Sequence, residues 1–109
     1  MKKFMIIYHM PESALEGIER TAETREEGMK QWFDWRDRMG DKLLDFGSPL
    51  SYGTKIAPDG STSSDGSNVA GYSIIQAESL EDAQKLLEGH PHLGWSQACD
   101  LVLHEYMEM

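Results

Sequence analysis

Histidines are the side chains of this chain best suited to moving a proton near neutral pH. The sequence has four, and two of them, His90 and His92, flank Pro91 where a helix is expected to end. A third, His9, closes an apolar strand. Imidazoles at a helix end can also simply satisfy free carbonyl groups. We interpret His90 and His9 as candidate catalytic bases and His92 as a candidate ligand contact.

A carboxylate provides a third candidate base. Asp45 alternates with Leu44 and Phe46 on an expected strand, so its side chain points to the opposite face from theirs. Facing a cavity, it would have a raised pKa and could accept a proton, whereas facing outward it would only be solvated. Asp45 therefore joins the candidate catalytic residues.

Three aromatic residues are candidate ligand contacts. Tyr8 and Tyr72 lie on expected strands, and Trp35 lies on the best-defined expected helix. At 100° per residue, Trp35 is roughly 90° from the centre of the apolar stripe of that helix. We therefore expect Trp35 at the edge of the buried face, where it either lines a ligand cleft or packs at a boundary. The stripe consists of Met29, Trp32, Phe33, Met39 and Leu43.

Other chemistries have weaker support. The spacing of His90 and His92 suits a metal only in an extended segment, and no third ligand lies close by beyond Asp100 and His104. The single cysteine, Cys99, has no evident activator. The glycines do not have the spacing of a phosphate loop. We predict neither a metal nor a cofactor.

The charge balance restricts the partners. The 109 residues include 10 Lys+Arg and 19 Asp+Glu, a formal net charge of −9. Binding to nucleic acid or to anionic membranes needs clustered basic residues, and no basic stripe is present. The apolar start at residues 4–8 is too short for a signal peptide or a membrane span, and one cysteine suits a reducing compartment. We expect a cytoplasmic protein of one domain, residues 1–109.

The candidate residues need a scaffold, and hydrophobic periodicity predicts one. Ser79 begins the second helix as its N-cap, and Gly89 with Pro91 ends it. Residues 12–23 are interpreted as a solvent-facing helical turn or a connection. Strands are expected at 4–9, 43–47, 69–77 and 101–106, a helix at 24–42, a short edge strand at 51–56, and a loop or hairpin tip at 58–67.

The order strand, helix, strand, strand, helix, strand predicts an α+β ferredoxin-like sandwich, with an antiparallel sheet and both helices on one face. Residues 4–8 are apolar on both sides of their strand, so the second sheet face also needs cover. A bare apolar face of several strands is larger than soluble monomers tolerate. We therefore expect a homodimer that pairs through this sheet face.

Several segments, in order along residues 3–106, resemble the YCII-related family, including its DGPF-domain relatives. The ordered set carries the resemblance more than any one motif: KFMIIY at 3–8, MKQWFDW at 29–35, LDFGSPL at 44–50, GYSIIQA at 71–77, SLEDA at 79–83 and GHP at 89–91. The resemblance implies a dimeric α+β barrel of ferredoxin-like subunits, mostly without established activity.

The chain departs from the family pattern at three places. Some members have been proposed as enzymes from a histidine and an aspartate in the cleft, with the histidine on the first helix, yet residues 24–42 contain none. The DGPF tetrapeptide is also absent, and His90 stands where relatives often have an acidic residue before proline. The proposed dyad therefore cannot be transferred. The expected function is a homodimer that binds a small molecule in a cleft and could be an enzyme; the alternative is a non-catalytic interaction or regulatory module.

Overall fold

The centre of the protein is a four-stranded antiparallel sheet with the order β2-β5-β1-β6. The computed structural model describes residues 1–15 and 21–108, so the part of the expected 12–23 segment at 16–20 lies outside the described residues. The predicted order of strands and helices is confirmed. The elements are β1 (Lys2–His9), α1 (Ala22–Met39), β2 (Leu43–Pro49), β3 (Thr54–Ile56), β4 (Thr62–Ser64), β5 (Val69–Ala77), α2 (Leu80–Leu86) and β6 (Asp100–Glu105), with 3₁₀ helices η1 (Glu12–Leu15), η2 (Gly40–Lys42) and η3 (Pro91–Gly94).

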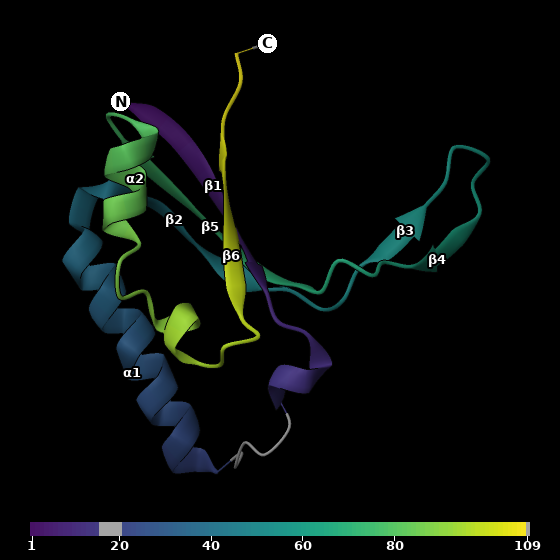
Figure 1. Ribbon diagram of the computed structural model, residues 1–109, viewed down its shortest axis with the longest axis horizontal. Coiled ribbons are helices and arrows are strands. Elements are labelled where there is room, and N and C mark those ends of the chain that lie inside the picture. The colour runs from purple at the N-terminus through teal and green to yellow at the C-terminus, as the bar shows by residue number, and fades with distance from the viewer. Residues whose placement is uncertain (16–20, 109) are drawn as a thin grey trace.

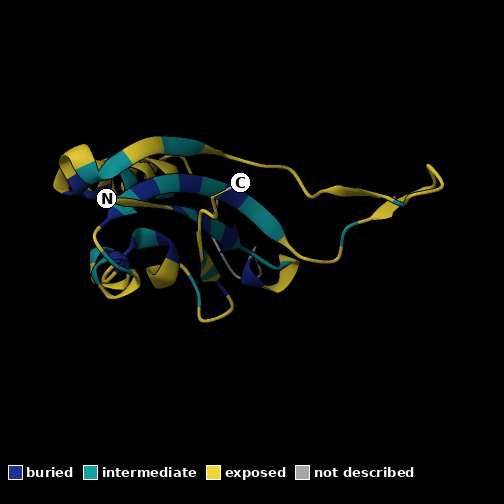
Figure 2. Ribbon diagram, turned by 90° about the horizontal axis from the view of Figure 1, so that it is seen from above, coloured by how far each residue is buried: buried dark blue, intermediate teal, exposed yellow. Residues whose placement is uncertain are grey.

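The two faces of the sheet have different environments. On β1, Phe4, Ile6 and Tyr8 are buried, whereas Met5 and Ile7 are only partly buried. Both helices lie on the same side of the sheet (Figure 1), and buried positions alternate with less buried ones along the strands (Figure 2). The helices therefore cover one face and leave the other uncovered, as predicted.

Helix α1 is rotated relative to the sequence-based expectation. Trp35, expected at the edge of the buried face, is its most buried residue at 1% exposure, so this prediction was wrong. Met29 and Phe33, expected inside, are 48% and 40% exposed. The stripe that faces the protein runs through Gly28, Trp32, Trp35 and Met39, with spacings of four, three and four. Gly28 adds no hydrophobic signal to this stripe, which shifted the apparent centre toward Met29.

Local capping signals define the helix ends. The Ser79 hydroxyl accepts the backbone N–H of Asp82 at 3.1 Å, which confirms Ser79 as the N-cap of α2. Thr21 and Thr24 form a capping box that starts α1, a signal not recognised in the sequence. Gly40 follows α1 with φ +56°, a conformation that glycine adopts without steric penalty.

Strands β3 and β4 form a separate hairpin that projects from the ends of β2 and β5, opposite the helices in Figure 1. Residues 51–56 were expected to add an edge strand, but β3 pairs with β4 instead, with Lys55 opposite Ser63. The turn is closed by the Ala57 N–H donating to the Ser61 carbonyl at 2.8 Å. Ile56 on this hairpin is 71% exposed.

Replacing Trp35 by alanine tests the corrected packing of α1. We expect Trp35→Ala to lower the free energy of unfolding by about 3–5 kcal/mol, because it empties a fully buried site. Urea denaturation followed by circular dichroism measures this change. Trp95→Ala is the control: Trp95 is 40% exposed, so its loss should cost about 1 kcal/mol or less. Equal losses for the two variants would contradict the packing described.

Candidate functional site

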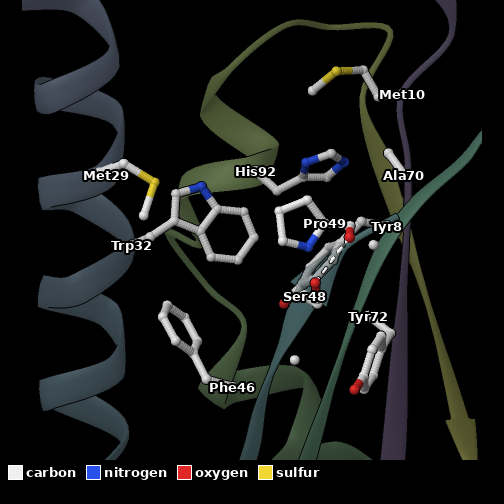
Figure 3. Close-up of a pocket in the computed structure, with 12 residues that line it drawn as sticks. Tyr8, Met10, Met29, Trp32, Phe46, Ser48, Pro49, Ala70, Tyr72 and His92 are labelled. Carbon is white, nitrogen blue, oxygen red and sulfur yellow. Dashed lines mark hydrogen bonds between the residues drawn. The ribbon is translucent and has the colours of Figure 1, made fainter. Parts of the chain in front are cut away.

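A cavity of about 230 Å³ lies between α1 and the ends of the central strands (Figure 3). Helix α1 supplies Met29 and Trp32, strand β1 supplies Tyr8, and η3 supplies His92. The described residues that line it include no Asp, Glu, Lys or Arg, and His92 is the one histidine among them. The complete lining is Tyr8, Met10, Met29, Trp32, Phe46, Gly47, Ser48, Pro49, Ala70, Gly71, Tyr72 and His92.

Aromatic rings form much of the cavity wall. The Trp32 indole meets the Tyr8 ring edge-on, with 5.1 Å between centroids and an interplanar angle of 88°. Its centroid lies 6.2 Å from that of Phe46, which β2 contributes from the opposite side. Edge-on and tilted rings at these distances pack favourably, and together they give this part of the cavity an apolar aromatic lining. The wall therefore suits a small planar molecule.

Strand β2 approaches β5 closely at the cavity. Gly47 has φ +83°, and a Cβ atom there would lie 1.7 Å from the carbonyl oxygen of Tyr72. Only glycine fits this position, because both the backbone conformation and the space exclude a side chain. The pairing register of β2 with β5 shifts between Asp45 and Ser48, around this glycine. The bend places Phe46, Gly47 and Ser48 along the cavity.

A directed chain of hydrogen bonds runs beneath the cavity through the Tyr8 hydroxyl. Nδ1 of His90 accepts the backbone N–H of His92 at 3.0 Å, so a neutral His90 carries its hydrogen on Nε2 and donates it to Tyr8 Oη, also at 3.0 Å. Tyr8 Oη donates to Ser73 Oγ at 2.8 Å. Ser73 Oγ donates in turn to the Phe46 carbonyl at 2.7 Å. Backbone groups at both ends thus set the direction of the chain.

Burial keeps the two titratable members of this chain neutral. His90 is 1% exposed, and desolvation, with smaller contributions from His92 and Arg38, lowers its pKa to about 3. Burial also raises the pKa of Tyr8 well above its usual range, and the hydrogen bond with Ser73 only partly opposes this. Neither group changes charge at physiological pH.

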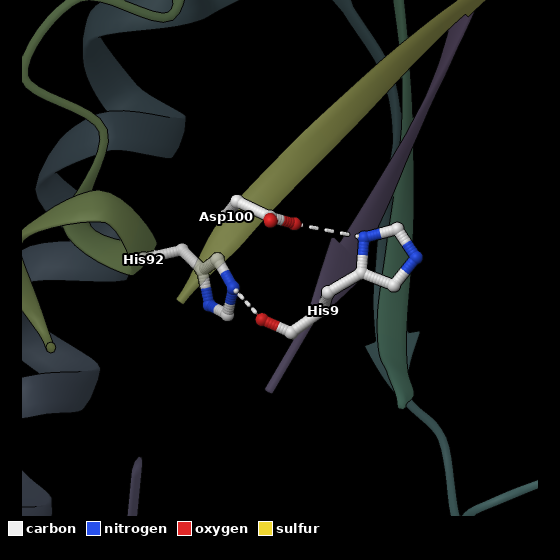
Figure 4. A network of polar contacts seen from close by, with 3 residues as sticks. All are labelled: His9, His92 and Asp100. Carbon is white, nitrogen blue, oxygen red and sulfur yellow. Dashed lines mark hydrogen bonds and ion pairs between the residues drawn. The ribbon is translucent and has the colours of Figure 1, made fainter. Parts of the chain in front are cut away.

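The orientation of His92 leaves one ring nitrogen available. Nε2 lies 2.8 Å from the His9 carbonyl, which can only accept, so Nε2 carries the hydrogen (Figure 4). In the neutral ring Nδ1 then has a lone pair, and no described residue is its hydrogen-bond partner. Because no buried side-chain nitrogen or oxygen in the described chain lacks a partner, Nδ1 must be accessible to solvent. His92 lines the cavity, so this lone pair is a candidate acceptor for a ligand.

The His9 imidazole is part of a different contact. Its Nδ1 lies 2.9 Å from Asp100 Oδ1, and the two residues are directly opposite each other on β1 and β6 (Figure 4). The pair shares the face of the sheet that the helices leave uncovered, and His9 does not line the cavity. His9 contributes to the site through its backbone carbonyl, which orients His92.

The other residues predicted from the sequence are divided between the cavity and its surroundings. Tyr8, Tyr72 and His92 line the cavity, while His90 lies beneath it against Tyr8. Trp35 packs in the core with its ring 4.4 Å from that of His90, so it supports the site without lining it. Asp45 is exposed and accepts the backbone N–H of Gly47 at 2.8 Å.

Sequence reasoning missed Trp32, Phe46, Met10, Met29 and Ser48 as lining residues. The helical spacing from Gly28 to Met39 could have identified Trp32, but nothing local marked the others. No group of three or more His, Cys, Asp or Glu side chains able to hold a metal ion occurs among residues 1–15 and 21–108. No described helix is long and apolar enough to cross a membrane.

The fold and the site define a small ferredoxin-like α+β domain with an aromatic cavity between its first helix and its sheet. The chain belongs to the YCII-related domain family, whose model matches residues 1–98. It is similar in structure to 5-chloro-2-hydroxyhydroquinone dehydrochlorinase from Burkholderia phenoliruptrix AC1100, solved in complex with 2,5-dihydroxybenzoquinone, with a TM-score of 0.57 and 14% sequence identity over 100% of this chain and 96% of the other. The comparison with curated proteins gives no match. The resemblance to the family is thus confirmed.

The buried, neutral His90 makes folding stability depend on pH. An unfolded histidine binds a proton below about pH 6.5, whereas His90 in the folded protein does not until about pH 3, so the unfolded state gains protons as the pH falls through this window. We expect stability to fall by about 2 kcal/mol between pH 7.5 and pH 5 through His90 alone. Urea denaturation at the two pH values measures it.

The variant His90→Gln should have a smaller loss over this interval than the wild type, although it is less stable throughout. Lys30→Gln is the control, because Lys30 is exposed on α1 and lies outside the hydrogen-bond chain, so this variant should lose as much stability over the interval as the wild type. The same loss in wild type and His90→Gln would show that His90 is not the residue responsible.

Proposed function

We propose that the cavity binds a small aromatic molecule that carries hydroxyl groups. The observation that supports this most directly is the polarity of the site: nearly all side-chain hydrogens that line it are already donated within the protein. Tyr8 donates to Ser73, and Ser48 donates to the Pro49 carbonyl at 2.9 Å. The Tyr72 side chain lies on the uncovered sheet face, and its hydroxyl donates to Asp45 at 3.4 Å.

The cavity therefore offers mainly acceptors to a ligand. His92 donates its Nε2 hydrogen to His9, which leaves the Nδ1 lone pair, and the one uncommitted side-chain donor in the described lining is the indole N–H of Trp32. A ligand with hydroxyl donors satisfies such a site, and a flat ring suits the walls of Trp32 and Phe46. The dehydrochlorinase of similar fold is itself bound to a hydroxylated ring compound, which agrees with this proposal.

The same geometry suggests a base, should the protein be an enzyme. A ligand hydroxyl that donates to His92 Nδ1 can transfer its proton there, which leaves an aryl oxide and an imidazolium whose Nε2–H remains on the His9 carbonyl. We assign this role to His92 in preference to the other candidates. His90 uses both ring nitrogens in hydrogen bonds, and neither His9 nor Asp45 lines the cavity.

Binding of matched probes tests the proposal. Resorcinol has two hydroxyl groups where m-xylene has two methyl groups of about the same size. Titration calorimetry with wild-type protein should show that resorcinol binds at least tenfold more tightly, because its hydroxyl donates to His92. The variant His92→Phe should lose most of this preference. Lys30→Gln, which changes an exposed residue of α1 that does not line the cavity, should keep it. Equal affinities for the two probes in the wild type would contradict the proposed function.

We further propose that the protein is a homodimer that pairs through the uncovered sheet face. Ile7 lies directly opposite Tyr72 on one side and Val102 on the other, and Met5 lies opposite Ile74, so these side chains share that face. A contiguous apolar surface of this kind favours burial against a second copy. An open cavity supports ligand binding over the alternative of a purely regulatory or interaction module, which would not need one.

The sheet-face dimer can be tested in solution. We expect the wild type to sediment as a dimer at micromolar concentration and Ile7→Glu to sediment as a folded monomer, because the new carboxylate would be buried without a partner. Leu80→Glu is the control, since Leu80 is exposed on α2 at the helix-covered side. A wild-type monomer, or an Ile7→Glu dimer, would contradict this arrangement.

A further inference from the structure

A second cavity of about 320 Å³ adjoins the first along α1. Met10, Met29, Trp32 and His92 line both cavities, so the two lie side by side, and we treat them as two lobes of one groove. We call them the aromatic lobe and the outer lobe. The residues that line only the outer lobe are Thr24, Arg25, Gly28, Pro91 and Trp95.

The outer lobe differs from the aromatic lobe in charge. Arg25 contributes a guanidinium group, and among the described lining residues of either lobe it is the one with a fixed charge. No carboxylate of the described residues lines the outer lobe, although the chain has a net charge of −9. Arg25 forms no ion pair with any described residue, so its donors are available. A planar guanidinium with free N–H groups matches a carboxylate.

Trp32 offers a second donor between the two lobes. Its indole nitrogen points away from Phe46, toward Met29 (Figure 3). No described residue accepts the indole N–H, and since no buried side-chain nitrogen or oxygen in the described chain lacks a partner, this N–H is open to solvent. Trp32 thus presents a ring face to the aromatic lobe and an unpaired N–H to the groove.

Gly28 leaves space in the outer lobe. Glycine inside a helix costs about 1 kcal/mol relative to alanine. Packing does not require it here, because a Cβ atom at this position would meet Trp95 Cζ3 at 3.7 Å, an ordinary contact. The backbone does not require it either, since Gly28 lies within α1 and is not among the glycines with positive φ. The missing side chain leaves this part of the groove open.

We propose that the outer lobe binds the carboxylate of an aromatic acid whose ring lies in the aromatic lobe. Arg25 pairs with the carboxylate, and the Trp32 N–H donates to one of its oxygens. A short linker between ring and carboxylate passes His92, which lines both lobes. This inference rests on the proposed function, because it extends the ligand from a hydroxylated ring to a hydroxylated ring that carries an acidic tail.

The test uses three probes that share one ring: p-cresol, 3-(4-hydroxyphenyl)propionate and the neutral amide of that acid. With wild-type protein, titration calorimetry should show the acid binding at least tenfold more tightly than the amide, with a preference that weakens as salt is added. Arg25→Gln should make acid and amide equal and leave p-cresol binding unchanged. Lys30→Gln, the same charge change on an exposed position that lines neither lobe, should keep the preference for the acid.

A second variant tests the space in the outer lobe. Gly28→Leu should weaken the acid and the amide at least tenfold and leave p-cresol binding intact, because leucine fills the outer lobe alone. Failure of p-cresol to bind the wild type would overturn the proposed function and this inference with it. Binding of p-cresol together with equal affinities for acid and amide, or an acid preference that survives in Arg25→Gln, would overturn the outer-lobe inference alone.

Discussion

The site depends on the hydrogen-bond chain through the Tyr8 hydroxyl. It begins at the backbone N–H of His92, passes through His90, Tyr8 and Ser73, and ends at the backbone carbonyl of Phe46. It therefore connects η3, β1, β5 and β2 within the region that α1 covers. Every member donates in one direction, and reversing one bond would leave a buried polar group unsatisfied. The chain joins the segments that make up the wall of the cavity.

The surroundings of this chain explain why it stays neutral and rigid. The His90 ring lies 4.8 Å from Trp32 and 4.4 Å from Trp35, and these apolar neighbours exclude the water that a charged imidazole would need. Trp35 also donates its indole N–H toward the Leu86 carbonyl at 3.5 Å, which connects α1 to the end of α2. Because the chain ends at a carbonyl oxygen and not at solvent, it orients Tyr8 but offers no exit for a proton.

Local signals in the sequence predicted the scaffold well. Alternation predicted β5 at 69–77, matching Val69–Ala77, and the Ser79 cap predicted the start of α2. These features depend on neighbours in sequence. The rotation of α1 about its axis depends instead on which of its side chains pack against the sheet. Because Gly28 has no side chain, hydrophobic periodicity did not identify the buried stripe through Trp32 and Trp35.

The candidate site was predictable only in part, for a related reason. Tyr8, Tyr72 and His92 were recognised as residue types with useful chemistry, and they do line the cavity. Their roles follow from long-range partners, such as the His9 carbonyl that determines which nitrogen of His92 is free. Phe46 is brought to the cavity by the bend at Gly47. The reason for a glycine there is the Tyr72 carbonyl on β5, which is distant in sequence. No local pattern contains that information.

The β3–β4 hairpin has a consequence for the behaviour of the chain in concentrated solution. Its strands pair with each other and with no other described strand, so the outer edge of each carries unpaired backbone groups, and such edges are templates for aggregation. Short strands, the charge of Lys55 and the hydroxyl side chains of residues 61–64 limit this hazard, whereas Ile56 is an exposed apolar exception. Strand β4 thus has the serine-rich composition that is typical of a loop. In this strand the polar side chains limit pairing of its exposed edge with another chain.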